Sequence, residues 1–450
     1  MNKIKSPAVA GSFYPSDAQQ LLSNINYFYQ NNRQDYNIAT RAIIVPHAGY
    51  YYSGQIASEG FQYLKKSVKN IFIFAPAHHV GFEGMALSSF DSWQTPLGEI
   101  PVNQEINKEL EKRFHCAFND YAFEKEHAVE VQVPFIQAYF DSVKIIPVLI
   151  GDAKPEKIVA IIENYWDDVS NGFVFSSDLS HFLESTDAKK IDKITAQMIE
   201  TLEVSSFQHQ QACGALGILG LVEFAKNRGF SLIRINMKNS GDVSGDKDSV
   251  VGYGSWFLYE DTKSKFIKDN FSDFVIEICK ASIKAGLEGR KLDVQEEYKR
   301  LPAVLEEYGA CFVTLNHNDM LRGCIGSIIA HQPLIDDLVQ NSRSSAFSDN
   351  RFYPLSEQEY PDIQISVSLL SSPEKMSFKD EEDLLNQIKP FEDGIIIRDE
   401  NYQAVYLPSV WEQLPEKTLF LNSLKQKAGL SPDYFSDTFE AYKFSTVHIP

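Results

Sequence analysis

Cysteine is scarce in this sequence, and its cysteines form no recognised cluster. The 450 residues contain five: Cys116, Cys213, Cys279, Cys311 and Cys324. An odd, scattered set argues against a disulfide framework and fits a reducing cytoplasm. No CxxC or CxxxCxxC motif occurs, which excludes a zinc ribbon and a radical-SAM iron–sulfur cluster in their usual forms.

Long apolar runs and an excess of positive charge are also missing. The first residues, MNKIKSPAVAGSFYPS, have no apolar core, so we expect no secretory signal, and every apolar run is well short of a membrane span. The chain has 61 acidic and 42 basic residues, a formal net charge of −19. Such a surface repels phosphate backbones. We therefore expect a cytoplasmic protein that binds neither membranes nor nucleic acid.

The chain is long enough for more than one hydrophobic core. Up to residue 259, short apolar strands alternate with amphipathic helices, which predicts an α/β layer fold. Residues 260–265, EDTKSK, are polar and aperiodic, as in a linker. Most later segments are strand-like, which predicts a separate α+β domain. We expect the domains to cover 1–261 and 262–450.

The spacing of apolar residues predicts the main elements of both domains. In the first domain we expect strands at 43–45, 71–74, 143–150 and 173–177, and helices at 16–33, 155–166, 187–203 and 214–227. The stretch EHAVEVQVPFIQAYF, from residue 126, also has a helical pattern. In the second domain we expect helices at 267–286, 333–345 and 418–428, and a hairpin at 394–407.

Two histidines follow predicted strands in similar contexts. His47 stands in IIVPHAGYYYSG (43–54), and His78 stands in IFIFAPAHH (71–79). Ligand sites of open α/β sheets form just beyond the carboxyl ends of the strands. We therefore expect His47 and His78 at neighbouring strand ends, facing one crevice. The tyrosine run 50–52 beside His47 suits a binding wall or ordinary packing.

Four other polar residues stand at the edges of predicted elements. His127 and Glu130 are three apart in EHAVE, so on a helix they share a face, either as a ligand pair or as a surface pair. Asp178 and His181 are also three apart and follow a predicted strand end. A carboxylate or a second imidazole near a ligand orients it or transfers protons.

Cys213 begins the segment CGALGILGLVEF, in which glycines recur every three residues. This stripe indicates close helix packing, with a buried, unreactive cysteine as the ordinary outcome. A helix N-terminus also stabilises a thiolate, which favours metal binding or redox chemistry. Imidazole and thiolate together suit zinc, iron or copper. The sequence leaves both interpretations of Cys213 open.

The first domain resembles the Memo family, and the matching motifs occur in the family's order through most of this domain. They are PAVAGSFYP (7–15), IIVPHAGYYYSG (43–54), FAPAHH (74–79), EHAVEVQVPF (126–135), IIPVLIG (145–151), SSDLSHF (176–182), ACG (212–214) and VVGYGSWFL (250–258). The resemblance implies an α/β fold similar to that of class III extradiol dioxygenases.

The resemblance also implies a metal site of two histidines and a cysteine, which fall on His47, His78 and Cys213. Iron is the implied ion, with copper or zinc as alternatives. His127, Asp178 and His181 are the implied catalytic or proton-transferring residues. The dioxygenases have a carboxylate where Cys213 stands. Because a thiolate changes the electronics of iron and is easily oxidised, ring cleavage is disfavoured.

The second domain contains the compact motif LRGCIG, in which two glycines flank Cys324. One interpretation is a bulge or a close backbone approach. The other is a shallow pocket in which the charge of Arg322 lowers the pKa of the Cys324 thiol. Asp349 and Arg351, in SSAFSDNRF, either pair with each other or bind a polar ligand in the same pocket.

The second domain resembles the AMMECR family, whose fold is α+β with two lobes. The matching segments are LPAVLEEYGACFVTL, LRGCIGSI, SSAFSDNRFYPLSEQEY, ISVSLLSSPE and AVYLPSV. A Memo unit joined to an AMMECR unit implies an AmmeMemoRadiSam-type system with a separate radical-SAM protein as partner. We expect a metal-binding, redox-linked enzyme or enzyme component acting on an unknown small substrate. The alternatives are a non-catalytic metal carrier or adaptor, and a metal-free module that binds a peptide or an anion.

Overall fold

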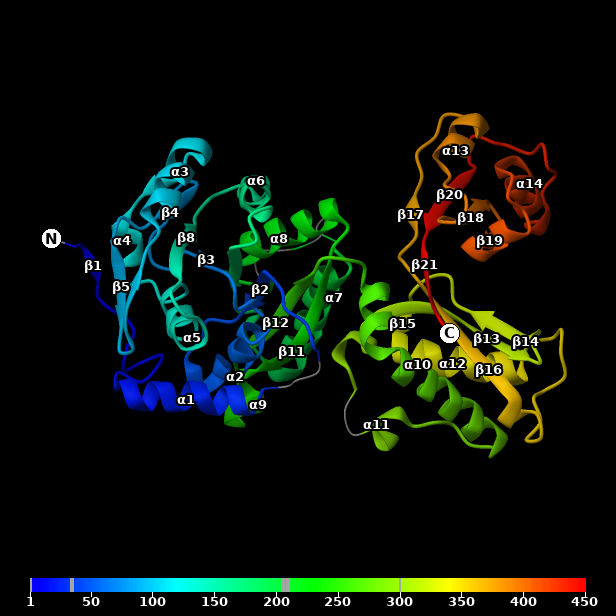
Figure 1. Ribbon diagram of the computed structural model, residues 1–450, viewed down its shortest axis with the longest axis horizontal. Coiled ribbons are helices and arrows are strands. Elements are labelled where there is room, and N and C mark those ends of the chain that lie inside the picture. Colours follow the sequence, from blue (N-terminus) through cyan, green and yellow to red (C-terminus); the bar gives the residue numbers. More distant parts are fainter. Residues whose placement is uncertain (1, 33–35, 204–206, 208–210, 299–300) are drawn as a thin grey trace. The chain divides into compact units, whose positions relative to one another are not determined.

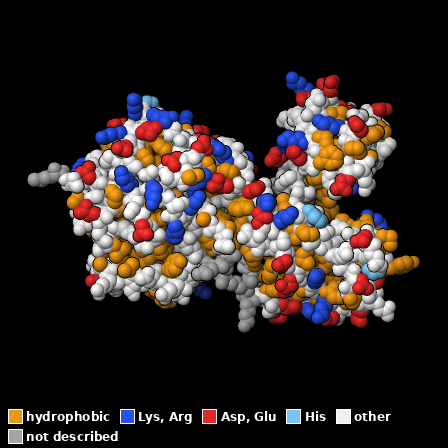
Figure 2. All heavy atoms as spheres, in the orientation of Figure 1, with side chains coloured by type: hydrophobic (Ala, Val, Ile, Leu, Met, Phe, Trp, Pro, Cys, Tyr) orange, Lys and Arg blue, Asp and Glu red, His pale blue; other side chains and the backbone are white. Residues whose placement is uncertain are grey.

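The computed structural model describes residues 2–32, 36–203, 207, 211–298 and 301–450. The chain divides into two compact units, Met1–Lys263 and Ser264–Pro450, shown in Figure 1. On the face drawn in Figure 2, acidic and basic side chains are interspersed. Within the described ranges, no helix is both long enough and apolar enough to cross a membrane.

The first unit is built on a mixed sheet with the strand order β10-β12-β2-β9-β3-β8-β4-β7, and β11 pairs with β12. Its centre is parallel and consists of β2 (Ala42–Val45), β9 (Asn171–Ser176), β3 (Asn70–Pro76) and β8 (Lys144–Ile150). Every residue of β2 and β9 is buried, as is typical of parallel strands covered on both faces. The four predicted strands are confirmed, with small shifts at their ends.

The order of these strands corrects one expectation. β9 pairs with both β2 and β3, so it lies between the two strands that precede His47 and His78. The prediction that these two strands are neighbours is therefore wrong. Side-chain packing and strand pairing, rather than order along the chain, decide where β9 inserts. The consequence is that the loop after β9 enters the space between the two histidine loops.

Helices cover both faces of this sheet (Figure 1). α2 (Tyr50–Phe61) packs against β2, β11 and β12. On the other face, α8 (Ala215–Arg228) contacts β3 and β9 and packs against α6 (Pro155–Trp166). The predicted helices of this unit are present, but the segment from residue 126 begins as a loop and becomes α-helical only at α5 (Val133–Tyr139).

The glycines before and within α8 explain its close approach to the sheet. A Cβ atom on Gly214 would lie 2.6 Å from the Ser176 carbonyl oxygen, and one on Gly220 would lie 2.6 Å from Cγ2 of Ile158. Any larger residue would push the helix away from β9 and α6. The predicted packing role of this stripe is confirmed.

The remaining elements of the first unit complete the sheet edges and the helical layers. They are β1 (Ile4–Lys5), α1 (Ala18–Gln30), β4 (Met85–Leu87), β5 (Ser92–Thr95), β6 (Gly98–Pro101), α3 (Gln104–Phe114), β7 (Ala117–Phe118), α4 (Asp120–Phe123), η1 (Glu130–Gln132), β10 (His181–Leu183), α7 (Ser185–Glu200), β11 (Ser231–Asn239), α9 (Ser240–Ser244) and β12 (Val250–Tyr259). Strands β1, β5 and β6 form a separate small sheet.

The second unit is α+β and contains two antiparallel sheets, in the orders β14-β13-β16-β21 and β17-β20-β18-β19. The strands are β13 (Tyr308–His317), β14 (Met320–Gly326), β15 (Gln332–Pro333, paired with β13), β16 (Ile363–Leu370), β17 (Glu374–Lys375), β18 (Gly394–Asp399), β19 (Tyr402–Tyr406), β20 (Glu440–Phe444) and β21 (Thr446–Ile449). The predicted hairpin is the antiparallel pair β18–β19.

The helices of this unit are α10 (Lys263–Leu287), α11 (Val294–Glu297), η3 (Ala303–Leu305), α12 (Leu334–Phe347), η4 (Tyr360–Asp362), α13 (Glu381–Gln387), η5 (Pro408–Glu412) and α14 (Lys417–Lys427). The polar segment expected as a linker is helical from Lys263 onwards. One reason is the ion pair between Lys265 and Asp269, four residues apart at 2.9 Å, which supports the first turns.

Candidate metal centre

The loop after β2 carries His47 into the interior of the first unit, where its side chain is only 1% exposed. The backbone N–H of His47 donates to Oδ1 of Asp178 at 2.8 Å. Asp178 follows β9, the strand next to β2 in the sheet. The intervening strand therefore supplies the carboxylate that holds the histidine loop in place.

The hydrogen bonds around His47 determine which ring nitrogen carries the proton. Its Nδ1 lies 2.9 Å from the hydroxyl oxygen of Ser176. That hydroxyl donates its own hydrogen to the Ala128 carbonyl and already accepts from the Gln132 amide. Nδ1 must therefore be the donor, because Ser176 has no second hydrogen to give. Nε2 therefore carries the lone pair, which is the position where an imidazole binds a metal ion.

His78, in the loop after β3, is held by the carboxylate of Glu126. The backbone N–H of His78 donates to Oε2 at 2.6 Å, and Nδ1 lies 2.9 Å from Oε1. Because an ionised carboxylate only accepts, Nδ1 carries the proton and the lone pair of Nε2 is free. A carboxylate behind an imidazole in this way orients metal-binding histidines in many proteins.

His127 completes a cluster of three imidazoles. Its ring stacks on His78 with centroids 4.7 Å apart, and it lies 5.4 Å from the ring of His47. One ligand nitrogen from each of the three histidines lies within 4.8 Å of the others. Bonds of about 2.0–2.1 Å to one ion bring ligand nitrogens to about 3–4 Å, so small side-chain adjustments suffice. The cluster can hold a metal ion.

The environment keeps two of these imidazoles, His47 and His127, neutral. Burial, reinforced by the charge of His78, lowers the pKa of His47 to about 3. Burial and the charge of His47 lower the pKa of His127 to about 4. A neutral imidazole is the form that binds metals. Both rings are therefore ready to bind an ion at neutral pH without first losing a proton.

Glu126 is a functional residue that the sequence reasoning missed, because His127 was weighed only with Glu130. Burial opposes ionisation of Glu126, but the bonds from His78 and from the backbone of Ala128 outweigh it and lower the pKa of the carboxyl to about 2. Its Oε1 also accepts from the His127 backbone N–H at 2.9 Å. The position of Glu126 directly before His127 was the available signal.

Glu130 lies elsewhere and is buried, so it forms neither of the two arrangements with His127 that the sequence allowed, a ligand pair or a surface pair. Its carboxylate accepts from Lys5 Nζ (2.9 Å), from the Tyr14 hydroxyl (2.8 Å) and from the backbone N–H groups of Ala8 and Val9. The reason is that the segment is not helical between residues 126 and 129, so residues 127 and 130 share no face. Glu130 ties the N-terminal segment to the core.

Cys213 touches the cluster at one point. Its Sγ lies 3.1 Å from Nε2 of His47, and the backbone N–H of Asp178 donates to the same sulfur at 3.3 Å. Sulfur and nitrogen ligands of one ion lie about 3.1–3.6 Å apart, given bonds of about 2.3 and 2.0–2.1 Å. The separation therefore fits two donors to one ion, although the sulfur is not among the mutually close ligand atoms.

The thiol of Cys213 is not the pre-formed thiolate that a helix N-terminus favours. Burial and the neighbouring carboxylate of Asp178 raise the pKa of the thiol to about 12, against the bonds from the backbone of Asp178 and the hydroxyl of Ser177. The increase in the thiol pKa caused by burial is larger than the decrease that the N-terminus of α8 would cause. The thiol is neutral at neutral pH.

Asp178 and His181 both stand at the same end of the sheet. Burial raises the pKa of Asp178, and the His47 backbone N–H and the charge of His181 act in the opposite direction. Asp192 of α7 lies behind this turn and accepts from the Ser180 backbone N–H at 3.0 Å.

The tyrosines of the expected binding wall differ in exposure: Tyr50 is buried, whereas Tyr51 is 71% exposed.

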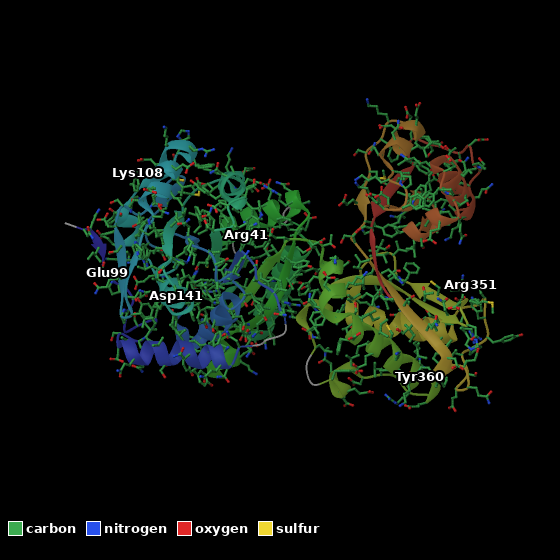
Figure 3. The ribbon with its side chains drawn as sticks, viewed as in Figure 1. Arg41, Glu99, Lys108, Asp141, Arg351 and Tyr360 are labelled. Atoms are coloured by element: carbon green, nitrogen blue, oxygen red, sulfur yellow. The ribbon has the colours of Figure 1, made fainter. Side chains whose placement is uncertain are left out.

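In the second unit, Asp349 and Arg351 bind the backbone of Cys324. The Cys324 N–H donates to Asp349 Oδ2 at 2.9 Å, and Arg351 donates to the Cys324 carbonyl at 3.2 Å and to Asp349 at 2.7 Å. β14 is an edge strand, so these side chains satisfy backbone groups that would otherwise lack a partner strand. Arg351 is labelled in Figure 3.

Arg322 has a different partner, since it donates to Glu359 at 2.8 Å. The sulfur of Cys324 instead accepts from the Thr314 hydroxyl at 3.3 Å. Gly323 confirms the close-approach interpretation of the LRGCIG motif: a Cβ atom there would lie 2.2 Å from the Ser345 carbonyl oxygen of α12.

The fold and the site define an α/β protein with a three-histidine cluster at the carboxyl ends of its parallel strands, followed by an α+β unit. Family models for Memo-like proteins and for AMMECR1 match residues 5–257 and 276–449, respectively. The chain belongs to the Memo family, and an AMMECR1 domain is fused to its Memo domain.

Curated relatives agree with this assignment. A MEMO1 family protein of Thermoplasma volcanium is 34% identical over 264 residues, covering 56% of this chain and 97% of the relative. One from Thermoplasma acidophilum is 33% identical over 262 residues, with 56% and 97% covered. A crystal structure of an uncharacterised protein from Pyrococcus horikoshii is 30% identical, covers 39% of this chain and 89% of its own, and has a TM-score of 0.37.

Proposed function

We propose that this chain is a metal-dependent, redox-linked enzyme or enzyme component that acts on a small substrate. The observation that carries the proposal is the convergence of three imidazoles, of which two have their Nδ1 atoms anchored, so that Nε2 is the nitrogen left to bind an ion. A purely structural histidine cluster has no need for two buried acceptors that each select the metal-binding tautomer.

His47, His78 and His127 would hold the ion, and Cys213 stands where its sulfur can bind the same ion beside His47. Nitrogen and sulfur donors together suit iron, copper or zinc. Iron is our first choice, because the family resemblance implies a fold similar to that of class III extradiol dioxygenases. A sulfur donor in place of a carboxylate points away from ring cleavage itself.

The bound ion would supply Lewis acidity and, if iron or copper, electron transfer. The surrounding residues have separate tasks. Glu126 and Ser176 orient the imidazoles. Asp178 holds the His47 loop, and with His181 we assign it to proton transfer at the substrate. We place the protein in the cytoplasm, with a separate radical-SAM protein as its partner in an AmmeMemoRadiSam-type system.

Metal analysis of anaerobically purified protein tests the proposal. We expect about one ion per chain, lost in a His47→Ala/Cys213→Ala double variant and retained in a His331→Ala control, whose histidine is in the second unit. Comparing His127→Ala with Cys213→Ser shows which residue completes the ligand set. Unchanged metal content in the double variant would overturn the proposal.

A non-catalytic metal carrier or adaptor is the second candidate. It is favoured by the exposure of the cluster, since the side chains of His78 and His127 are 28% and 18% exposed, so an ion there is accessible to a partner protein. This candidate predicts transfer of the ion to an apo acceptor and no substrate turnover by the chain alone. A single-turnover assay of the metal-loaded protein separates the two candidates.

A further inference from the structure

A cavity of about 310 Å³ in the first unit has Cys213 in its wall and so adjoins the candidate metal centre. It is formed where β3 and β8 end and where α8 begins. It shares Cys213 with the site, and Pro76 and Ala77 in its wall directly precede His78. A ligand in this cavity therefore lies against the cysteine that touches His47 and against the strand end that leads to His78.

The wall of the cavity combines apolar side chains with polar backbone and side-chain atoms. Val80, Phe82, Ile150 and Leu216 contribute side chains, and Gly81, Gly151 and Gly217 expose backbone. Apolar walls with a few polar groups are typical of small-molecule sites. An engineered cavity of about 150 Å³ holds one benzene, so this cavity has room for one substituted ring or two small fused rings.

The charged groups around the cavity indicate which charge its ligand carries. Among the described residues that line the cavity, Asp152 has the one ionisable carboxylate, and it is exposed. Two backbone N–H groups at the start of α8 already have acceptors and are not available to bind an anion. Gly214 N–H donates to the Ser177 hydroxyl, and Ala215 N–H donates to the Ala212 carbonyl. The full negative charge of Asp152 is larger than the positive partial charge that the N-terminus of α8 still offers. Binding of an anion in the cavity is therefore disfavoured.

We propose that this cavity binds a small aromatic molecule, neutral or cationic, with its ring beside Cys213. The proposal rests on the proposed function in one respect, namely that this molecule is the substrate of the metal centre. The binding itself depends only on the cavity and is measurable without an ion.

The test uses three probes of similar shape and different charge: benzyl alcohol, benzylammonium and benzoate. Saturation-transfer NMR on the full-length protein, chelator-treated and metal-loaded, gives the affinities. We expect benzyl alcohol and benzylammonium to bind at least about tenfold more tightly than benzoate. Equal binding of all three, or preference for benzoate, would overturn the proposal.

Two variants locate the site. Val80→Trp fills the cavity and should abolish binding of benzyl alcohol while metal content stays at the wild-type level. Asp152→Asn keeps the shape of the side chain and should reduce the difference in affinity between benzylammonium and benzoate. Asp141→Asn changes an exposed acid of the same unit, labelled in Figure 3, and should leave that difference unchanged. Probe binding that survives in a folded Val80→Trp protein, or an unchanged difference in affinity in Asp152→Asn, contradicts the proposal.

The two proposals fail separately. If the purified protein never binds an ion but the probes bind as expected, the proposed metal function falls and the aromatic site remains. If the ion is present and no probe binds, the aromatic site falls and the metal centre remains.

Discussion

The carboxylate of Glu126 binds His78 twice, accepting from its backbone N–H at 2.6 Å and facing its Nδ1 at 2.9 Å. One side chain thereby fixes the position of the loop after β3, the orientation of the imidazole and its tautomer. The oxygen that faces Nδ1, Oε1 of Glu126, also accepts from the backbone N–H groups of His127 and Ala128. Two of the three histidines of the cluster thus depend on a single buried acid.

We predict that Glu126→Gln weakens metal binding about 10- to 100-fold. The amide keeps the size of the side chain but loses the charge that orients His78 and favours its proton on Nδ1. Competition titration with a chromophoric chelator measures the affinity. Glu124→Gln is the matched control, because that acid is exposed and two residues away. Equal affinities for the two variants would show that Glu126 does not position the ligand.

We predict that Glu130→Ala destabilises the first unit by about 3–5 kcal/mol. The substitution leaves the Lys5 ammonium, 4% exposed, without its carboxylate, and removing one partner of a buried ion pair has about this effect. Denaturant unfolding followed by peptide-resolved hydrogen exchange measures the change unit by unit. Lys190→Ala, which breaks an exposed pair with Asp187, should leave stability close to that of the wild type. Similar effects for both would contradict the prediction.

We predict that Gly323→Ala destabilises the second unit by about 1–3 kcal/mol or more. The new methyl group would lie 2.2 Å from the Ser345 carbonyl oxygen, which belongs to the backbone of α12 and cannot move without displacing that helix. Fluorescence of Trp411, a buried residue of this unit, reports its unfolding in a background where the tryptophans of the first unit are replaced. Gly81→Ala, in the first unit, meets no atom within 4 Å and should be close to neutral when unfolding of that unit is followed with its own tryptophans.

We predict that the second unit loses stability between about pH 4.5 and pH 2 through Glu359. The hydrogen bond from Arg322 and the Ser356 backbone N–H lower the pKa of this carboxyl from 4.5 to about 2. Because the folded pKa is the lower one, the contribution is fully present above about pH 4.5 and disappears as the pH falls through about 2. The side chain is 31% exposed, so the effect is at most about 1 kcal/mol.

Unfolding of the second unit at pH 5, 3.5 and 2 measures this effect. Glu359→Gln should flatten the dependence, whereas Glu357→Gln, an exposed neighbour, should leave it unchanged. A Glu359→Gln protein with the wild-type pH dependence would show that the Arg322 pair contributes nothing.

Much of the architecture was readable from local pattern. The buried runs predict β2, β3, β8 and β9, and the helices α6, α8 and α12 begin and end close to the predicted residues. The strand-end positions of His47 and His78, and the glycine stripe of α8, were equally visible. These features depend on neighbours in sequence, which is why periodicity and turn residues suffice to predict them.

The partners of the site residues were decided by the tertiary structure. β9 inserts between β2 and β3 because it pairs with both, and this brings Asp178 to His47. His127 joins the cluster because its segment is a loop and not a helix, which turns Glu126 rather than Glu130 toward the histidines. Burial, which no local pattern measures, leaves Cys213 a neutral thiol. The sequence by itself determined which residues stand at strand ends; chain packing decided which of them meet and in which protonation state.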